Sequence, residues 1–422
     1  MKNVFLFFHF LFFTTIVLSQ TNEIGAKVPL SPNASSLGKY IEIPVSLYTG
    51  IPNINIPIIS LPTKNLKLDV SLSYHASGIR VGEEASSVGL GWTLNAGGVI
   101  NRIVRGETDS KTRNPIIAFD DLTWQYVDNA SQTKIDDNQP DLYYYNFDGM
   151  TGKFFIGDDG SVVCNDNNNL KISLIANQAN DILQFKIVSS NGTTYLFGEN
   201  NNVDYSANQI FAPDNIDYGL PVQGLINSYP TAYFLTTMIS VDNLDSIRLS
   251  YDKENNTYYT NDSHRQDYSI SGQTNGTPSY TYSRIWIDSR RLKSIVSNAW
   301  SVEFEYLLNR EDLNSYNSDI PKSLSQMIVK DYQENVKKRI KFYNSYFNSS
   351  GIELATQTDK FKYKRLRLDS LQIFSGDLSE KLPPYIFKYD NVILPNKNST
   401  AQDYWGFYNG KVNNPTAMLP NI

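Results

Sequence analysis

Apolar and polar residues alternate with a period of two through almost the whole of this chain, and this pattern limits what it can fold into. Residues 67–74 are the clearest case. Leu68, Val70 and Leu72 alternate there with Lys, Asp and Ser side chains. Successive side chains of a strand point to opposite faces, so the alternation predicts a half-buried β-strand. No long stretch has the i, i+3, i+4, i+7 spacing of an amphipathic helix. We therefore expect a mainly β protein of antiparallel hairpins and sheets, with few or no helices.

The composition supports the same fold class. The chain has 28 Tyr against 5 Met, and aromatic residues make up 13% of it, which favours pleated, half-buried surfaces. Residues 141–160 read as strand, turn, strand and turn. Residues 182–197 read as a hairpin whose turn contains Asn191-Gly192, a strong hairpin signal. Residues 200–230 and 252–281 are polar and rich in turn residues, and we predict long surface loops there.

Proline and glycine mark the N-terminal part of the chain. Residues 40–62 alternate but contain prolines, which lack the N–H that a ladder needs, so we predict edge or surface strands there. Glycines recur through residues 78–98. Glycine weakens a strand unless the backbone must bend or approach another backbone closely. The segment therefore predicts a bulged turn, a short strand around Trp92 and a further strand at residues 99–104.

A weak repeat is visible in the second half. Residues 235–252, 292–306 and 368–390 each read as a strand, a polar turn and a strand with Tyr at or next to its end. The spacing is irregular, so the segments are a family of hairpins and not a strict array. Sheet formation alone also produces such alternation. We predict that one face of each second strand is apolar: Ile247, Leu249 and Tyr251; Val302, Phe304 and Tyr306; Tyr385, Phe387 and Tyr389.

The N-terminus predicts export. Lys2 precedes an apolar run from Val4 to Val17, and small or modest side chains follow it, so we expect a signal peptide over residues 1–19, cleaved after Ser19 or close by. The alternative is a retained anchor, but the run is shorter than the roughly 20 residues of a spanning helix. The lone Cys164 excludes an internal disulfide. We expect β regions at residues 20–110, 111–230 and 231–422.

Charge and motifs argue against several function classes. The formal net charge is −6 and no basic stripe is visible, so nucleic acid is not an expected partner. The basic runs at residues 337–339 and 362–367 read as solvated strand faces. Gly89 and Gly91 could begin a dinucleotide fingerprint, but Leu94 stands where the third glycine belongs and no helix is predicted to follow. We predict no cofactor.

Candidate catalytic and metal-binding residues are few. The histidines are His9, His75 and His264, and with one Cys they are too few to favour a His/Cys metal site or a catalytic triad. Two carboxylates suffice for a glycosidase, yet adjacent acidic residues in a strand point to opposite faces. In turns such pairs read as solvated side chains. Calcium could bind the Asp- and Asn-rich turns, but the EF-hand pattern fails at Lys171. The acidic pairs are Glu83-Glu84, Asp120-Asp121, Asp136-Asp137 and Asp158-Asp159.

The five Trp residues could build a sugar-stacking platform. Trp92 and Trp300 lie in apolar alternation and read as core. Trp124 and Trp405 stand among polar residues and are the candidates for exposed contacts. We expect no catalytic, cofactor-binding or metal-binding residue. The positions expected to matter for structure are Trp92, Gly89, Gly91, Gly97, Gly98, Tyr251, Tyr306, Tyr389 and Trp405.

The hairpins resemble the YD-repeat, in which a strand, an Asn/Gly turn and a strand ending in Tyr-Asp form a sheet. Tyr251-Asp252 and Tyr389-Asp390 match that ending, whereas Leu307 follows Tyr306. Residues 74–98 resemble the region ahead of the repeats in Bacteroidetes Rhs/YD-repeat proteins and, less closely, the start of SpvB and of toxin-complex B-type components. Residues 403–410 resemble the segment after which YD arrays begin in those proteins.

The resemblance implies a β-rich scaffold and no catalytic residue of this chain. The sequence ends at Ile422, where an array is expected to start, and it contains no Asp-Pro-x-x-Gly-like sequence. The closed shell, self-cleavage and C-terminal toxin of complete family members are therefore not carried over, and the chain could be a truncated product, a fragment or a separate module.

Three functions remain open from the sequence. The leading hypothesis is a non-enzymatic exported scaffold or shell module, with protein as its partner, either the rest of a YD-repeat shell or a second copy. The second is a carbohydrate-binding adhesin with a glycan partner, and the third is a glycoside hydrolase. Binding to a glycan array distinguishes the second from the first, and activity on polysaccharides identifies the third.

Overall fold

The computed structural model describes residues 49–105, 108–109, 123–125, 139–164, 168–176, 182–211, 228–268, 274–356, 359–403 and 405–411. The chain divides into two compact units, residues 1–53 and 54–422, and all the strands described below belong to the second. The predicted signal peptide at residues 1–19 and the predicted strand at residues 40–48 lie outside the described residues.

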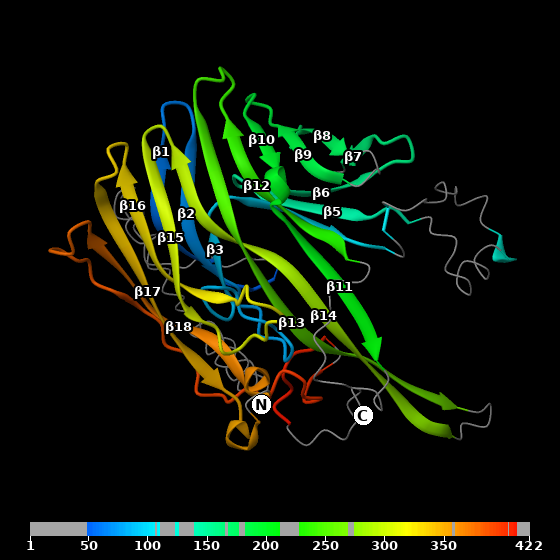
Figure 1. Ribbon diagram of the computed structural model, residues 1–422. Coiled ribbons are helices and arrows are strands. Elements are labelled where there is room, and N and C mark those ends of the chain that lie inside the picture. The colour runs from blue at the N-terminus through cyan, green and yellow to red at the C-terminus, as the bar shows by residue number, and fades with distance from the viewer. Residues whose placement is uncertain are drawn as a thin grey trace, which may run out of the picture. The chain divides into compact units, whose positions relative to one another are not determined.

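The predicted fold class is confirmed, since the described residues of the second unit form mainly antiparallel β-sheet (Figure 1). Sixteen strands are joined in one large sheet, which runs from β19 at one edge to β7 at the other. Its strands are β4 (Gly98–Ile103), β5 (Leu142–Phe147), β6 (Met150–Ile156), β7 (Val162–Cys164), β8 (Lys171–Ala176), β9 (Ile182–Val188), β10 (Thr194–Phe197), β11 (Val203–Phe211), β12 (Tyr229–Ile239), β13 (Ser246–Tyr268), β14 (Thr274–Ser297), β15 (Trp300–Asn309), β16 (Lys322–Asp331), β17 (Val336–Asn348), β18 (Lys364–Ser375) and β19 (Tyr385–Ile386).

The large sheet branches at β12, because this strand changes partners along its length. Its first half pairs with β11 and β4, and its second half pairs with β10 and β13. One branch continues from β4 through β5, β6 and β7, and the other from β10 through β9 and β8. Short 3-10 helices join some strands: η2 (Glu199–Asn201), η4 (Ile352–Leu354) and η5 (Lys360–Tyr363).

A second, three-stranded sheet contains β1 (Ile54–Pro62), β2 (Lys67–Tyr74) and β3 (Trp92–Asn95). The proline-containing β1 is an edge strand, as the sequence predicts, and it pairs only with β2 among the described residues. In β2 the expected alternation is confirmed, since Leu68, Val70 and Leu72 are all buried.

The two short hairpins predicted from their turns are confirmed. β5 and β6 pair in register around Asp148-Gly149, with Phe147 opposite Met150. β9 and β10 pair with Val188 opposite Thr194, so the turn holds Asn191-Gly192. Both turns contain a glycine at positive φ, which is the conformation that tight hairpin turns require.

The predicted loop at residues 252–281 is wrong. β13 and β14 form one long hairpin whose ladder extends from Ile247 opposite Ser297 to Tyr268 opposite Thr274. β11 likewise occupies part of the predicted loop at residues 200–230 and pairs with β14. Ladder hydrogen bonds come from the backbone, so a segment of Tyr, Thr, Ser and Asn forms strands once a neighbouring strand is present.

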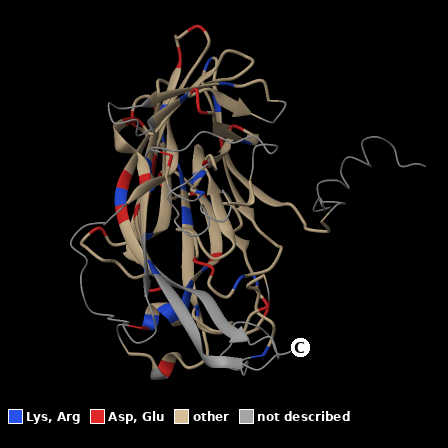
Figure 2. Ribbon diagram, turned by 90° about the vertical axis from the view of Figure 1, so that its right-hand side faces the viewer, with Lys and Arg blue, Asp and Glu red and all other residues tan. Residues whose placement is uncertain are grey.

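The core joins both sheets. One cluster of buried side chains contains Leu68, Val70 and Leu72 of the small sheet together with residues of the large sheet such as Tyr145 and Val302. The two sheets therefore bury their apolar faces against one another, as layered β proteins do. Figure 2 shows that Lys and Arg are interspersed with Asp and Glu along the described strands.

The hairpin repeat is only partly confirmed. β12 with β13 and β14 with β15 form the first two predicted hairpins, and Ile247 and Val302 are buried on their second strands. In the third, β19 contains only Tyr385 and Ile386, and Tyr385 is exposed. The prediction of a strong last strand with Tyr385 on an apolar face is therefore wrong, since the ladder between β18 and β19 spans two residues and no side chain among the described residues covers Tyr385 fully.

Candidate functional site

Trp92 joins two distant parts of the chain. It opens β3, is 4% exposed and packs between the rings of Tyr74 and Phe387, whose centroids are 5.0 and 4.5 Å away. Its Nε1 donates a hydrogen bond of 2.8 Å to the Tyr389 hydroxyl, which donates to the Leu368 carbonyl at 2.6 Å. These bonds attach the Gly-rich segment to β18 and to the residues that follow β19.

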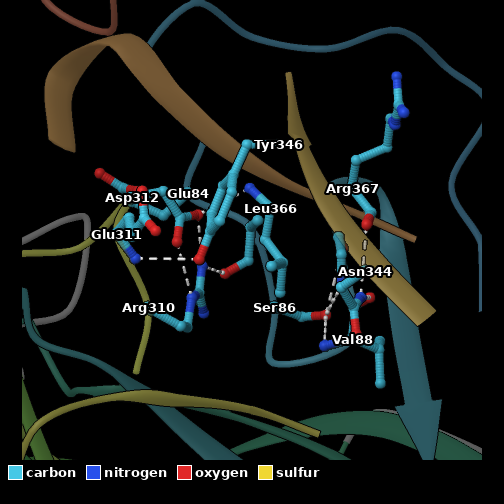
Figure 3. Close-up of polar contacts among 12 residues, drawn as sticks. Glu84, Ser86, Val88, Arg310, Glu311, Asp312, Asn344, Tyr346, Leu366 and Arg367 are labelled. Carbon is cyan, nitrogen blue, oxygen red and sulfur yellow. Dashed lines mark hydrogen bonds and ion pairs between the residues drawn. The ribbon is translucent and has the colours of Figure 1, made fainter. Parts of the chain in front are cut away.

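The Gly-rich segment approaches the backbone of β18 closely. The Leu90 N–H donates to the Leu366 carbonyl at 2.8 Å. Gly89 has φ of +149°, and a Cβ there would lie 2.9 Å from the backbone nitrogen of Leu368. The side chain of Asn344 also donates to the Val88 carbonyl at 2.8 Å (Figure 3). A glycine at position 89 is thus required by both conformation and space.

The other glycines singled out from the sequence also meet close neighbours. A Cβ at Gly91 would lie 2.7 Å from the Tyr74 ring, and one at Gly97 would lie 2.8 Å from Leu249. Gly98 opens β4 directly against Phe147. These glycines therefore allow β3 and β4 to lie close to neighbouring strands.

A buried ion pair lies next to this segment and was not predicted. Arg310 donates from Nε and Nη2 to the two carboxylate oxygens of Asp312, at 2.9 and 2.7 Å. Nη2 also donates to the Ala85 carbonyl at 2.9 Å, while Asp312 accepts the Leu366 N–H at 2.9 Å. Figure 3 shows Arg310, Asp312 and Leu366 together. The pair connects the β15–β16 loop to the Gly-rich segment and to β18.

A second ion pair extends the cluster to the C-terminal part of the chain. The Lys397 ammonium pairs with Glu84 and donates to the Asp312 backbone carbonyl. The neighbouring Glu83 instead accepts the Arg80 N–H at 3.2 Å. The two adjacent carboxylates therefore have different partners and do not converge on one point. The prediction that such a pair outside a strand is solvated is wrong for Glu84, because the distant Lys397 covers and pairs with its carboxylate.

Burial controls the ionisation of this cluster. It raises the pKa of Glu84 above its ordinary value, although Lys397 favours the carboxylate. It lowers the pKa of Lys397, although Glu84 and Asp312 favour the ammonium. Burial also opposes ionisation of Asp312, but Arg310 prevails and holds the pKa of that carboxyl below its ordinary value. The Arg310–Asp312 pair therefore stays charged inside the protein.

Arg365 contradicts the prediction that residues 362–367 are a solvated strand face, because its side chain is 0% exposed. Its guanidinium donates to the Val81 and Pro395 carbonyls at 2.6 and 3.0 Å and to the Ser349 hydroxyl at 3.2 Å. Burial lowers the pKa of Arg365 to about 10. Arg365 alternates with the apolar positions of β18 and so lies on the opposite face of the strand from them. That face is buried because distant segments, at Val81 and Pro395, cover it.

The Tyr residues at hairpin ends have a shared role in two of three cases. The Tyr251 hydroxyl donates to the Leu235 carbonyl at 2.6 Å, and Tyr389 donates to Leu368 at the same distance. In both, the closing Tyr bonds to the Leu at which the predicted repeat begins. Tyr306 differs, since its ring lies beneath the Arg291 guanidinium, 5.3 Å from the centroid.

A groove lies beside β17 and β18. It has a volume of about 480 Å³ and is lined by residues 346–348 and 387–394 together with Arg367 and Asp369. Phe347 meets Tyr389 edge to face, with centroids 5.1 Å apart. The groove therefore combines aromatic walls with a charged pair.

That charged pair is held in place from several sides. Arg367 Nε donates to Asp369 Oδ1 at 2.7 Å, and the Ser345 hydroxyl donates to the same oxygen at 3.0 Å. The Arg367 guanidinium also lies over the Phe347 ring, 5.4 Å from its centroid. Both charged side chains are about one-third exposed, at 38% and 35%. Within the described part of the chain, no hydrogen bond engages the terminal nitrogens of Arg367 or Oδ2 of Asp369.

The edge of the large sheet at β19 exposes apolar side chains. Tyr385 and Ile386 are 45% and 66% exposed, and the nearby Leu382 is also exposed. We call these three residues the terminal-edge strip. β19 pairs with β18 at Ser370 and Leu371, and the flanking Leu382 and Phe387 N–H groups donate to the Ile373 and Asp369 carbonyls of β18, both at 2.9 Å.

The remaining candidates from the sequence lie apart from these features. Trp124 and Trp405 are both largely exposed, at 83% and 73%. His75 is exposed and its ring contacts the Ser77 hydroxyl. His264 lies in β13, and its side chain is not among those described. Asp159 accepts the Ser161 N–H at 2.9 Å in an Asx turn.

Neither a metal centre nor a membrane-spanning helix is found among the described residues. They contain no group of three or more His, Cys, Asp or Glu side chains suited to a metal ion. They also contain no helix with the length and apolar character of a membrane span. The pairs Asp120-Asp121 and Asp136-Asp137 lie outside the described residues.

Comparison with known proteins found a similarity in structure but none in sequence. No protein-family model matches the chain, and no curated protein matches it. The structure is similar to that of the N-terminal domain of effector protein SpvB from Salmonella typhimurium strain LT2. The alignment covers 76% of this chain and 98% of that chain, with 11% identity and a TM-score of 0.36. This is a distant structural similarity.

Proposed function

We propose that this chain is a non-enzymatic, exported scaffold module of the Rhs/YD-repeat type, which joins its large sheet to further β-structure at the terminal-edge strip. The observation that carries the proposal is the exposure of Tyr385 and Ile386 on a strand with a two-residue ladder. Unpaired edges carry free N–H and C=O groups and readily add another strand.

Adjacent backbone supports the same role. No backbone hydrogen bond is described for residues 388–394, which follow β19 directly and include the exposed Val392 and Ile393. Apolar side chains next to unpaired backbone favour association with another polypeptide, because both are buried when a strand is added. The partner that fits is a β-strand, from a YD-repeat shell or from a second copy of this chain.

The ionisable residues support a structural function. The Asp312 carboxylate binds Arg310 and the Leu366 N–H, and the Glu84 carboxylate pairs with Lys397. These groups stabilise contacts between distant segments. The Tyr251 and Tyr389 hydroxyl bonds support the YD-type hairpin in the same way.

Self-association of the mature chain tests the proposal. Light scattering and sedimentation velocity should show an average mass that rises with concentration. Ile386→Lys should return the protein to a monomer, because a charge there opposes strand addition. Leu307→Lys is the matched control, since Leu307 is 67% exposed and lies at the far end of β15. It should leave association unchanged.

A monodisperse monomer at all concentrations, with unchanged behaviour in Ile386→Lys, would contradict association through this edge. It would instead favour a self-contained module. Hydrolysis of a polysaccharide by the purified chain would contradict the non-enzymatic part of the proposal separately.

A further inference from the structure

We infer that the groove beside β17 and β18 is a binding site for an uncharged saccharide. The inference does not rest on the scaffold proposal: Tyr385 and Ile386 do not line the groove, although residues 388–394, which lie beside the terminal-edge strip, do. It rests on the groove's size, its aromatic walls, its balance of charge and the hydrogen-bonding atoms of Arg367 and Asp369 that their mutual bond leaves unused.

The size suits a small oligosaccharide. The cavity of about 480 Å³ falls within the range of roughly 300–1,000 Å³ found for small-ligand sites. Such sites combine apolar walls with a few polar groups at fixed positions. The groove has this character, with Phe347, Phe387 and Tyr389 on its walls.

The aromatic rings suit the C–H face of a sugar. The face of an aromatic ring carries partial negative charge, and sugar C–H groups carry partial positive charge, so the two pack favourably. The rings are also held in position. Phe387 packs on Trp92 at 4.5 Å, and Tyr389 is held by hydrogen bonds to Trp92 and Leu368. A rigid wall reduces the entropy lost on binding.

The charge of the groove favours a neutral ligand. Its charged lining residues are two cations, Arg367 and Lys388, and two anions, Asp369 and Asp390, so the formal charges cancel. A phosphate or a nucleotide would need an excess of positive charge. An uncharged polyol needs donors and acceptors side by side, and an Arg–Asp pair supplies both.

The bond between Arg367 and Asp369 leaves hydrogen-bonding atoms of both side chains unused. Arg367 uses Nε and Asp369 uses Oδ1 for the bond between them. Both side chains remain about one-third exposed. The two terminal nitrogens of Arg367 and Oδ2 of Asp369 are therefore available to bind adjacent hydroxyl groups, with the donor fork and the acceptor already oriented.

Calorimetric titration with neutral oligosaccharides tests the inference. The probes are cello-, xylo-, malto-, manno- and chito-oligosaccharides of two to four units, added to the full mature chain. At least one should bind. Asp369→Asn and Arg367→Lys should each weaken that probe at least tenfold, because the first removes charge and the second removes the planar fork. Lys338→Gln, on β17 outside the groove, should bind as the wild type does.

A second variant keeps the test valid if those substitutions disturb folding. Asn391 lines the groove and is exposed, so Asn391→Trp should leave the circular dichroism and melting temperature unchanged while it blocks binding. Absence of binding by every probe would overturn the inference. So would binding that survives Asn391→Trp.

Discussion

The indole Nε1 of Trp92 donates a hydrogen bond of 2.8 Å to the hydroxyl of Tyr389, 297 residues further along the chain. The same hydroxyl donates to the carbonyl of Leu368 at 2.6 Å. One Tyr side chain therefore connects the strand that begins at Trp92 with β18. The bonds explain why a Gly-rich segment far from the C-terminus has an ordered place beside the last strands.

Trp92→Ala should lower the free energy of unfolding by about 3–5 kcal/mol, because it removes a large buried aromatic side chain. Trp92→Phe and Tyr389→Phe each remove one end of the hydrogen bond and leave most of the packing. Urea unfolding of both single variants and the double variant should give a coupling energy of about 1 kcal/mol. Strict additivity of the two changes would show that the bond contributes nothing to stability.

Gly89→Ala should destabilise the protein by about 2–5 kcal/mol, since it adds backbone strain and places a Cβ against the backbone of Leu368. Gly149→Ala is the matched control. Gly149 also has positive φ, at +72°, but nothing lies within 4 Å of the position that a Cβ would take there, so strain alone should cost about 1–2 kcal/mol. Thermal melts of the two variants compare the costs. Equal effects would contradict the close approach of the Gly-rich segment to β18.

Asp312→Asn should cost about 3–5 kcal/mol at pH 7, because it leaves the Arg310 guanidinium buried without its anion. Asp69→Asn is the control, since Asp69 pairs with Lys67 on the surface and its loss should cost less than about 1 kcal/mol.

The pH dependence of Asp312→Asn follows from the lowered pKa of Asp312. Its stabilising contribution is present above the unfolded-state pKa, about 3.9, and is lost as the pH falls through the lower folded-state pKa. The gap between wild type and Asp312→Asn in urea unfolding should therefore narrow from pH 5 to pH 2. Both proteins retain Glu84, so their difference reports mainly on Asp312. A gap that is constant over this range would show that Asp312 is not ionised in the folded protein.

The predicted signal peptide implies where the mature chain should begin. Lys2 and the apolar run after it should direct the chain out of the cytosol, with cleavage close to Ser19. Edman sequencing of the exported protein should begin near Gln20 or Thr21. Recovery of the chain from the cytosol with Met1 intact would contradict export.

Several elements could be predicted because their signals are local. The alternation in β2 and the turns at Asp148-Gly149 and Asn191-Gly192 depend only on residues that are close in sequence. Strand and turn geometry relate such local patterns directly to backbone conformation. The long β13–β14 hairpin could not be predicted in this way. Its residues are polar and rich in turn formers, and only pairing with each other and with β11 makes them strands.

The candidate sites also differ in whether a local sequence signal marked them. The Gly-rich segment was noticeable in the sequence because glycine destabilises a strand unless the backbone must bend or approach another backbone closely. Gly89 does approach the backbone of Leu368 closely. Arg310 and Asp312 are two residues apart, a spacing that can place two side chains on one face of an extended chain, but nothing in the sequence marked them as buried. Lys397, which completes the cluster, comes from a distant segment.

The sequence by itself determined the fold class, the faces of the regular strands and the tight turns, because each depends on residues within a few positions of one another. Only the tertiary structure decided that Arg365 is buried, that Glu84 meets Lys397 and that Arg367 and Asp369 border a groove. Those outcomes depend on which distant segments cover a strand. Side-chain alternation specifies two faces for every strand, but it does not specify which distant segments pack against either face.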